Sequence, residues 1–198
     1  MGETSEKPPD NPANINIIND ELLVKQFNRG DDSAFDRIVE ENSAEIAAFA
    51  NQLLGWPADV DDVIQDIFLA AFLGLKKFRC DCSIKTWLFT ITINKCRSYR
   101  YKQMLRLKLF LKTAGQSTLT SNRAADKTMT DSETFNRVRH AVKALPPKYR
   151  EPVVLKYLQE IPTDKIVQIL GISKNALQAR LTRARQRLKK DLAELIKD

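Results

Sequence analysis

Residues 163–190 read TDKIVQILGISKNALQARLTRARQRLKK, and this stretch decides the predicted fold. In its first part Ile166 and Leu170 are separated by one helical turn, which predicts a short helix. Gly171 follows where a sharp turn is needed, and Ser173 can cap a second helix. Two helices joined by a turn of three or four residues that contains glycine are typical of a helix-turn-helix.

The second helix of this pair carries charge of one sign. From Lys174 to Lys190 there are seven basic residues and no acidic ones. Side chains near the start of such a helix meet base edges in the major groove, and later Arg and Lys side chains contact phosphates. Arginine can pair with guanine and glutamine with adenine. The pattern favours duplex-DNA binding over a merely solvated basic helix, through Ser173, Lys174, Asn175, Gln178, Arg180, Arg183 and Arg187.

A second informative stretch, residues 60–68, predicts a helix with one apolar and one acidic face. Asp62, Gln65, Asp66 and Leu69 are expected to lie near each other on its outer side. Taken alone, this segment is better explained by a solvated helix surface than by a binding site.

A long helix is predicted from about Ile84 to about Leu111. Cations and aromatic rings alternate along it, which is the combination that binds single-stranded DNA, since charge holds the backbone and rings stack on bases. About half of the rings are expected in the core instead. The residues concerned are Lys85, Lys95, Arg97, Arg100 and Lys102, with Trp87, Phe89, Tyr99 and Tyr101.

The whole chain of 198 residues predicts an all-α protein of two small helical domains joined by a flexible linker, the second being the helix-turn-helix domain. Net charge is −9 over residues 1–81, +9 over 82–125 and +7 over 126–198, so an acidic front precedes two basic blocks. Basic blocks suit phosphates, and an acidic surface suits a basic protein partner. The predicted divisions are a disordered lead-in (1–19), a first domain (20–112) in which Asp20 caps the first helix, a linker (113–131) and a second domain (132–198).

In this context the chain resembles the extracytoplasmic-function (ECF) sigma factors of bacterial RNA polymerase. Residues 60–69 are similar to the family's polymerase-binding helix, and residues 86–94 to the next helix, with its Trp-Leu pair and an Asn seven residues after the Trp. Residues 145–151 resemble the entry into the last domain. Residues 166–173 and 180–185 resemble its helix-turn-helix, and the matching segments occur in the family's order from about Asp20 to Leu188.

The resemblance implies a role for each segment. Asp62, Gln65, Asp66, Phe68 and Leu69 would bind core RNA polymerase. The minus-ten promoter element would be bound around the loop 78–83, which receives a flipped base, and along the following helix. The residues expected there are Phe78, Arg79, Lys85, Trp87, Asn94, Arg97 and Tyr101. The last helix would read the minus-thirty-five element, and an anti-sigma factor would hold the chain inactive.

Two positions and one short stretch depart from the family's pattern: Lys165 replaces an acid, Ala176 replaces a threonine, and residues 80–82 read Cys-Asp-Cys. They put promoter preference in doubt more than fold. The Cys-Asp-Cys spacing is too short for a usual zinc site, so neither metal nor cofactor is expected.

Two alternatives to a sigma factor follow from the sequence. One is a helix-turn-helix regulator with an N-terminal partner-binding domain. The other is an enzyme, which is disfavoured because the chain has one histidine and no nucleotide-binding loop. Without a long apolar run or a recognisable targeting segment, the protein is expected to be cytoplasmic.

Overall fold

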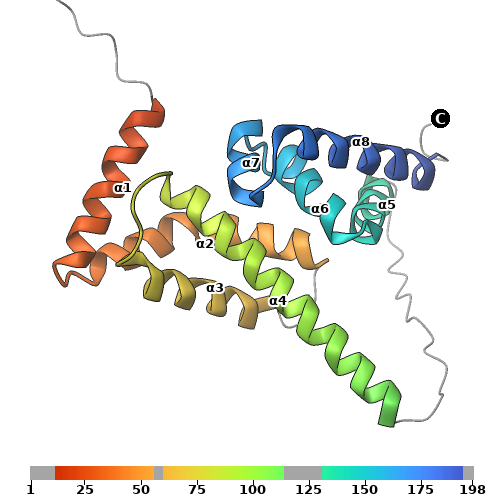
Figure 1. Ribbon diagram of the computed structural model, residues 1–198, viewed down its shortest axis with the longest axis horizontal. Helices are drawn as coiled ribbons and strands as arrows, with labels where there is room; N and C mark the ends of the chain where they lie inside the picture. Colours follow the sequence, from red (N-terminus) through yellow and green to blue (C-terminus); the bar gives the residue numbers. More distant parts are fainter. Residues whose placement is uncertain (1–11, 56–59, 114–130, 194–198) are drawn as a thin grey trace, which may run out of the picture.

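The computed structural model describes residues 12–55, 60–113 and 131–193. Over these ranges the protein is all-α and has no strand, which confirms the predicted fold class. Figure 1 shows a first group of helices, α1–α4, and a second group, α5–α8. In chain order the elements are α1 (Pro12–Asn28), α2 (Ser33–Leu54), α3 (Val60–Leu75), α4 (Ile84–Thr113), α5 (Asp131–Ala144), α6 (Pro147–Val153), the π-helical turn η1 (Val154–Leu158), α7 (Thr163–Leu170) and α8 (Lys174–Asp191).

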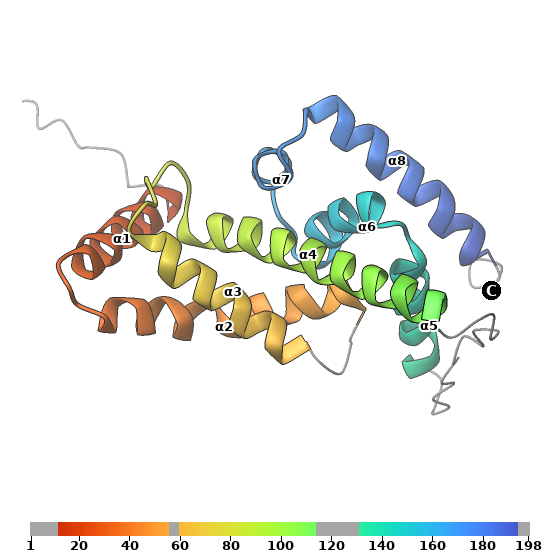
Figure 2. The same ribbon diagram turned by 60° about the horizontal axis from the view of Figure 1, so that its bottom comes forward.

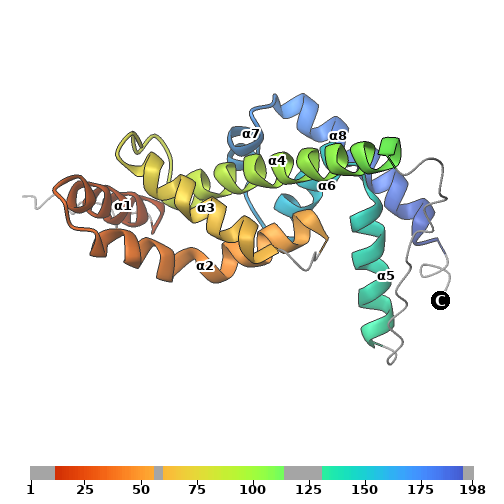
Figure 3. The same cartoon turned by 90° about the horizontal axis from the view of Figure 1, so that it is seen from below.

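Helix α4 is the central element, because α2 and α3 pack along one of its sides and α7 packs on another (Figures 2 and 3). Its first half is anchored by buried residues, among them Leu88 and Ile93. The ring of Phe89 meets that of Phe49 edge-on, with centroids 4.7 Å apart. Rings in this geometry add attraction beyond their buried area, so this pair fixes α4 on α2. The last turns of α4 project from the body (Figure 1).

The start of the chain differs from the prediction. Helix α1 begins at Pro12, so Asp20 lies inside it and does not cap it, and residues 12–19 are helical where a disordered lead-in was expected. Residues 1–11 lie outside the described ranges. The Asp20 carboxylate accepts a hydrogen bond of 2.8 Å from the backbone N–H of Ile84, the first residue of α4. Burial raises the pKa of Asp20 while this hydrogen bond lowers it, with burial the larger effect. Asp20 therefore ties α1 to the start of α4.

The helix-turn-helix forms as its sequence predicts. Gly171 ends α7 in the left-handed conformation, with φ of 62°, a region that residues with a Cβ rarely adopt. Ser173 caps α8, and its hydroxyl accepts a hydrogen bond of 3.2 Å from the N–H of Ala176. The sequence pattern predicts a last helix from Lys174 to about Lys197, but α8 ends at Asp191.

The segment before α7 is less regular than predicted. Apolar residues recur at helical spacing from about Lys148 to Gln159, which predicts a single helix, but α6 passes into the π-helical turn η1 after Val153. Pro152 lies inside α6 and has no N–H to donate, which removes one helical hydrogen bond just before the change. The wider turn is closed by the N–H of Gln159, which donates to the carbonyl of Val154 at 3.0 Å.

The two groups of helices lie against each other. The predicted linker falls almost wholly on residues 114–130, outside the described ranges, but α7 packs directly on α4 and η1 reaches α2. Gln159, the residue that follows η1, donates a hydrogen bond of 2.9 Å to Gln52 of α2. This contact between the groups is a feature that the sequence did not reveal. No described helix is long and apolar enough to cross a membrane.

Candidate nucleic-acid interface

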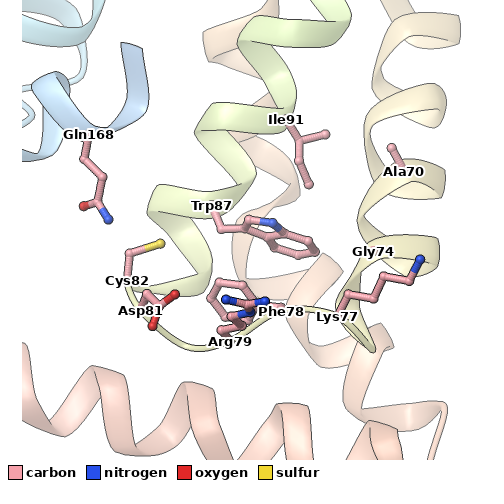
Figure 4. A pocket seen from close by; sticks show the side chains of 10 residues that line it. All are labelled: Ala70, Gly74, Lys77, Phe78, Arg79, Asp81, Cys82, Trp87, Ile91 and Gln168. Atoms are coloured by element: carbon pink, nitrogen blue, oxygen red, sulfur yellow. The ribbon is translucent and has the colours of Figure 1, made fainter. Parts of the chain in front are cut away.

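A hollow of about 520 Å³ lies between the end of α3, the loop 76–83 and the start of α4 (Figure 4). Its lining includes three residues that the sequence placed at single-stranded DNA, Phe78, Arg79 and Trp87. The indole of Trp87 stacks on the ring of Phe78, with centroids 4.8 Å apart and an angle of 28° between planes. The hollow thus combines an aromatic wall with the cation of Arg79, a pairing that suits an unstacked base and its phosphate.

The floor of this hollow depends on a glycine of α3. A Cβ built on Gly74 would lie 3.1 Å from the indole of Trp87, so a larger residue would push the ring outward. Gln168 of α7 lines the other side of the hollow and faces it in Figure 4. The first helix of the helix-turn-helix therefore borders a site built mainly by the first group of helices.

The other residues predicted at the opened strand lie farther along α4. Asn94 and Tyr101 are exposed, and Tyr101 stands at the start of the projecting part of the helix. The Lys85 ammonium forms an ion pair of 2.8 Å with Glu45 of α2. Phe89, in contrast, is 1% exposed and belongs to the core, so it cannot stack on a base. The structure thus divides the aromatic set of α4 between core and surface.

Arg97 is not free in this structure. Its guanidinium binds the Glu151 carboxylate of α6 through two hydrogen bonds, of 3.0 and 2.7 Å. This bidentate contact raises the pKa of Arg97, so the side chain stays charged. Nearby, burial lowers the pKa of Arg100, and burial together with the charge of Arg100 lowers the pKa of Arg150 to about 10.

The acidic face predicted on α3 is present. Asp62, Gln65, Asp66 and Leu69 are all exposed, and 57% of the Leu69 surface is open. Phe68 is half-buried and packs against the core, so it supports the face from beneath. The structure therefore presents carboxylates around an exposed leucine, a surface that suits a basic protein partner with an apolar spot.

A second hollow, of about 470 Å³, connects this acidic face with α4. Asp66 of α3 and Asn94 of α4 both line it, together with Lys95 and Lys102. Residues predicted for two different partners, protein and DNA, thus meet at one groove.

On α8 the residues predicted at duplex DNA occupy its open faces. Lys174, Asn175 and Gln178 are exposed at the start of the helix, and Ser173 is the cap. Arg180 is half-buried. Arg183 and Arg187 are exposed to solvent, on the side of α8 that lies next to α6. Leu177, Leu181 and Ala184 recur at spacings of three and four residues, which predicts one inner face, and they form the buried side.

A hollow of about 420 Å³ beside α8 contains residues that the sequence reasoning missed. Tyr149 of α6, Gln186 and Lys190 line it together with Arg183 and Arg187. Burial acts to raise the pKa of the Tyr149 hydroxyl, but hydrogen bonds and positive charge from Arg183 and Lys148 lower it overall. Such a set of donors suits an oxyanion. Lys190 could have been found as the last member of the basic run, whereas nothing in the sequence brings Tyr149 to α8.

Cys80 and Cys82 lie in the loop beside the first hollow and Cys96 is buried in α4. Burial, with the carboxylates of Glu21, Asp20 and Asp81, raises the pKa of Cys80, and burial is also the main cause of the raised pKa of Cys82. Raised pKa values disfavour the thiolate, the form that binds metals. The described residues contain no cluster of three or more groups able to hold a metal ion.

Comparison with known proteins gives two family matches in the expected order. Residues 38–105 match Sigma-70 region 2, and residues 135–188 match Sigma-70, region 4. The ECF RNA polymerase sigma factor SigW of Bacillus subtilis is 30% identical over 179 residues, an alignment that covers 87% of this chain and 96% of SigW.

Solved structures show the same fold. The structure of CnrH in complex with the cytosolic domain of CnrY has a TM-score of 0.64 and 30% identity, and the match covers 89% of this chain and 98% of CnrH. The sigma factor RpoE in complex with the anti-sigma factor NepR, from Bartonella quintana, has a TM-score of 0.61 and 24% identity over 80% of this chain and 96% of RpoE.

Proposed function

The chain belongs to the ECF sigma factors of bacterial RNA polymerase, and from this premise we propose how its surfaces divide the work of starting transcription. As a sigma factor it binds core RNA polymerase, recognises promoter DNA and supports initiation. The observation that carries the proposal is the presence of both sigma regions in one chain, each with its own exposed surface. The proposed domains are residues 20–112 and 132–198, joined by 113–131.

The acidic face of α3 is proposed to bind core polymerase. Asp62, Gln65 and Asp66 supply charge and hydrogen-bond acceptors, Leu69 supplies apolar contact, and Phe68 positions the helix from beneath. A negative surface of this kind steers a basic partner and repels DNA, which keeps this side of the molecule for protein.

The hollow at Trp87 is proposed to receive a base of the minus-ten element. Phe78 and Trp87 offer a ring surface, and Arg79, which also lines the hollow, would hold a flanking phosphate. Lys85, at the start of α4, would contact the backbone of the same strand once released from Glu45. Asn94, Arg97 and Tyr101 would continue the contact along α4. Stacking of one base on a protein ring stabilises a complex by about 1–3 kcal/mol, so capturing a flipped base helps to melt the duplex.

Helix α8 is proposed to read the minus-thirty-five element as duplex DNA. Lys174, Asn175 and Gln178 at its start would meet base edges, and Arg180 would lie at the groove. Arg183 and Arg187, in the hollow with Tyr149, suit backbone phosphates.

Three further properties are proposed by analogy with relatives. Because RpoE is known in complex with the anti-sigma factor NepR, and CnrH with the cytosolic domain of CnrY, we expect an anti-sigma partner. Sigma factors are in general not enzymes, and we expect this chain to act by binding alone. Its place would be the cytoplasm, where core polymerase works.

The test is run-off transcription with purified core polymerase on genomic promoter fragments, with mapped start sites. The native chain is expected to start transcription at defined positions. The double variant Asp62→Ala/Asp66→Ala is expected to lose most core binding, whereas the matched variant Asp36→Ala/Glu40→Ala, which removes two exposed carboxylates of α2, is expected to retain it. A chain that binds duplex DNA as a dimer but never starts transcription would instead be a helix-turn-helix regulator.

A further inference from the structure

The contact between the two groups of helices is centred on one buried carboxylate. Glu151 of α6 is 2% exposed, although it carries a charge. Its two oxygens accept hydrogen bonds of 3.0 and 2.7 Å from Arg97 of α4, and Arg100 of the same helix lies 3.9 Å away. A buried carboxylate is stable only with partners of this kind. Here those partners come from the other group of helices, so Glu151 is fully paired only while the groups touch.

The positive charges around Glu151 outnumber the negative ones. Arg150, beside it in sequence, donates hydrogen bonds to the carbonyl of Leu53 at the end of α2, at 2.8 Å, and to that of Leu145 at 3.0 Å. Arg100 also donates to Leu53. One carboxylate thus faces three guanidinium groups. Removing its charge would leave three neighbouring cations that repel one another, so Glu151 controls the stability of the contact.

We call the arrangement in which α5–α8 pack against α1–α4 the closed arrangement. Other contacts show which surfaces it covers. Gln168 of α7 lines the hollow at Trp87, and α7 packs on α4 (Figure 4). The hydrogen bond between Gln159 and Gln52 closes the arrangement at α2. Arg97 is expected to contact the opened strand, but in this structure its guanidinium forms an ion pair with Glu151. The closed arrangement therefore occupies parts of the surface assigned to melted DNA.

The closed arrangement also brings the two DNA-binding surfaces too close together. Promoter elements centred about 25 base pairs apart are about 85 Å apart on B-form DNA. In the structure α8, about 27 Å long, packs on α6, and α6 holds Arg97 of α4 at 2.7 Å. A chain of 17 residues, the length of 114–130, spans at most about 60 Å when extended, so this connection does not force the two groups to stay in contact.

We infer that Glu151 is a latch: by binding Arg97 and Arg100 it holds the helix-turn-helix group on α4, and the chain engages melted promoter DNA only after this contact opens. The inference rests on the proposed function for its biological meaning, but the latch itself is a physical contact that is measured without polymerase.

The first experiment removes the charge of the latch. In a chain with Cys80→Ser and Cys82→Ser, the pair Gln52→Cys and Gln159→Cys is joined by a short bismaleimide whose spacer is cleaved by dithiothreitol. Cys96 stays, because burial raises its pKa to about 12 and keeps the thiol unreactive. The cross-linking yield reports the closed fraction. Adding Glu151→Gln is expected to reduce the yield several-fold, whereas Glu160→Gln, the same charge change at an exposed site, is expected to leave it unchanged.

The same variants test what the latch covers. Without cross-linking, Glu151→Gln is expected to bind a fluorescein-labelled oligothymidylate about tenfold more tightly in fluorescence anisotropy, the effect of freeing about one contact to single-stranded DNA. The gain is expected to disappear in Glu151→Gln/Arg97→Ala. If Glu151→Gln matches Glu160→Gln in both cross-linking yield and oligonucleotide affinity, there is no latch.

The second experiment does not depend on the folding of a Glu151 variant. The cross-linked chain is purified, mixed with core polymerase and assayed for run-off transcription before and after the spacer is cleaved. Loss of at least ten-fold when locked, with recovery on cleavage, supports the inference. Equal activity in the locked and cleaved states overturns it. If the cleaved chain is also inactive, the proposed function fails, while the cross-linking yields of Glu151→Gln and Glu160→Gln still decide whether the latch exists.

Discussion

Helices α4 and α8 are both rich in Lys and Arg, yet their charges are placed differently. On α4, Lys85 pairs with Glu45 and Arg97 with Glu151. On α8, within the described part of the chain, no basic residue forms an ion pair with a carboxylate. The basic surface of α8 is thus ready for duplex DNA, whereas that of α4 is shared with acids of the same chain. The comparison teaches that basic composition predicts where nucleic acid binds but not whether the cations are available.

The largest effect is expected from Phe89→Ala, which tests whether the aromatic rings of α4 divide between core and surface. Because Phe89 is 1% exposed and packs edge-on against Phe49, its loss is expected to lower the free energy of unfolding by about 3–5 kcal/mol. The measurement is urea unfolding followed by circular dichroism. Tyr101→Ala is the matched control, since Tyr101 is 63% exposed and its loss is expected to change stability by less than about 0.5 kcal/mol. Equal stability of the two variants would contradict the division of the α4 rings into core and surface.

Next in size is Arg183→Ala on α8. Arg183 is exposed in the hollow with Tyr149, so its removal is expected to weaken duplex promoter binding by about 1–3 kcal/mol. If its contact is to a phosphate, the plot of the logarithm of the binding constant against the logarithm of the salt concentration should also become less steep by about one unit. The assay is a titration of the duplex minus-thirty-five element at several salt concentrations.

Arg180→Ala, in the half-buried position closer to the start of α8, provides the comparison. It is also expected to weaken duplex binding, but with loss of discrimination between sequences. Neither change should affect core-polymerase binding, and equal loss of core binding and DNA binding would contradict the separation of the two surfaces.

The features of α8 could be predicted from the sequence, whereas those of α4 could be predicted only in part. Helix α8 and its turn follow from local signals, the glycine that permits positive φ at Gly171 and the cap at Ser173. The acidic face of α3 likewise follows from spacing alone. Local patterns succeed here because each depends on residues within one or two turns.

The missed features that matter most for the site depend on contacts between distant residues. Arg97 and Glu151 are 54 residues apart, and Asp20 and Ile84 are 64 apart. The choice between Trp87 at the surface and Phe89 in the core also depends on how α4 sits on α2, since both residues are aromatic and neighbours in sequence. Spacing cannot decide such cases, because it carries no information about which helix lies opposite.

A smaller effect is expected from Ser173→Ala, which tests whether α8 depends on its cap. The Ser173 hydroxyl accepts a hydrogen bond from the N–H of Ala176, and loss of such a cap lowers stability by about 1 kcal/mol. Thermal unfolding and duplex binding are measured together. Ser173→Asp, which restores an N-terminal cap, should recover stability, although its charge should weaken DNA binding. No loss of stability on Ser173→Ala would show that packing of Leu177 and Leu181 alone holds the helix.

The smallest effect is expected from Glu45→Gln. A cation of α4 is unavailable either because a nearby carboxylate neutralises it or because the contact between the two groups of helices holds it, and this variant separates the two reasons. The pair with Lys85 has a distance of 2.8 Å but is partly open to solvent, with 48% and 35% of the two side chains exposed. Such pairs contribute about 0–1 kcal/mol, so stability should change little and affinity for oligothymidylate should rise by at most about fivefold. That is less than expected for Glu151→Gln, because Glu151 is buried and also joins the two groups of helices. If Glu45→Gln raised affinity as much as Glu151→Gln, local neutralisation of α4 would explain both effects, and the contact between the groups would have no separate role.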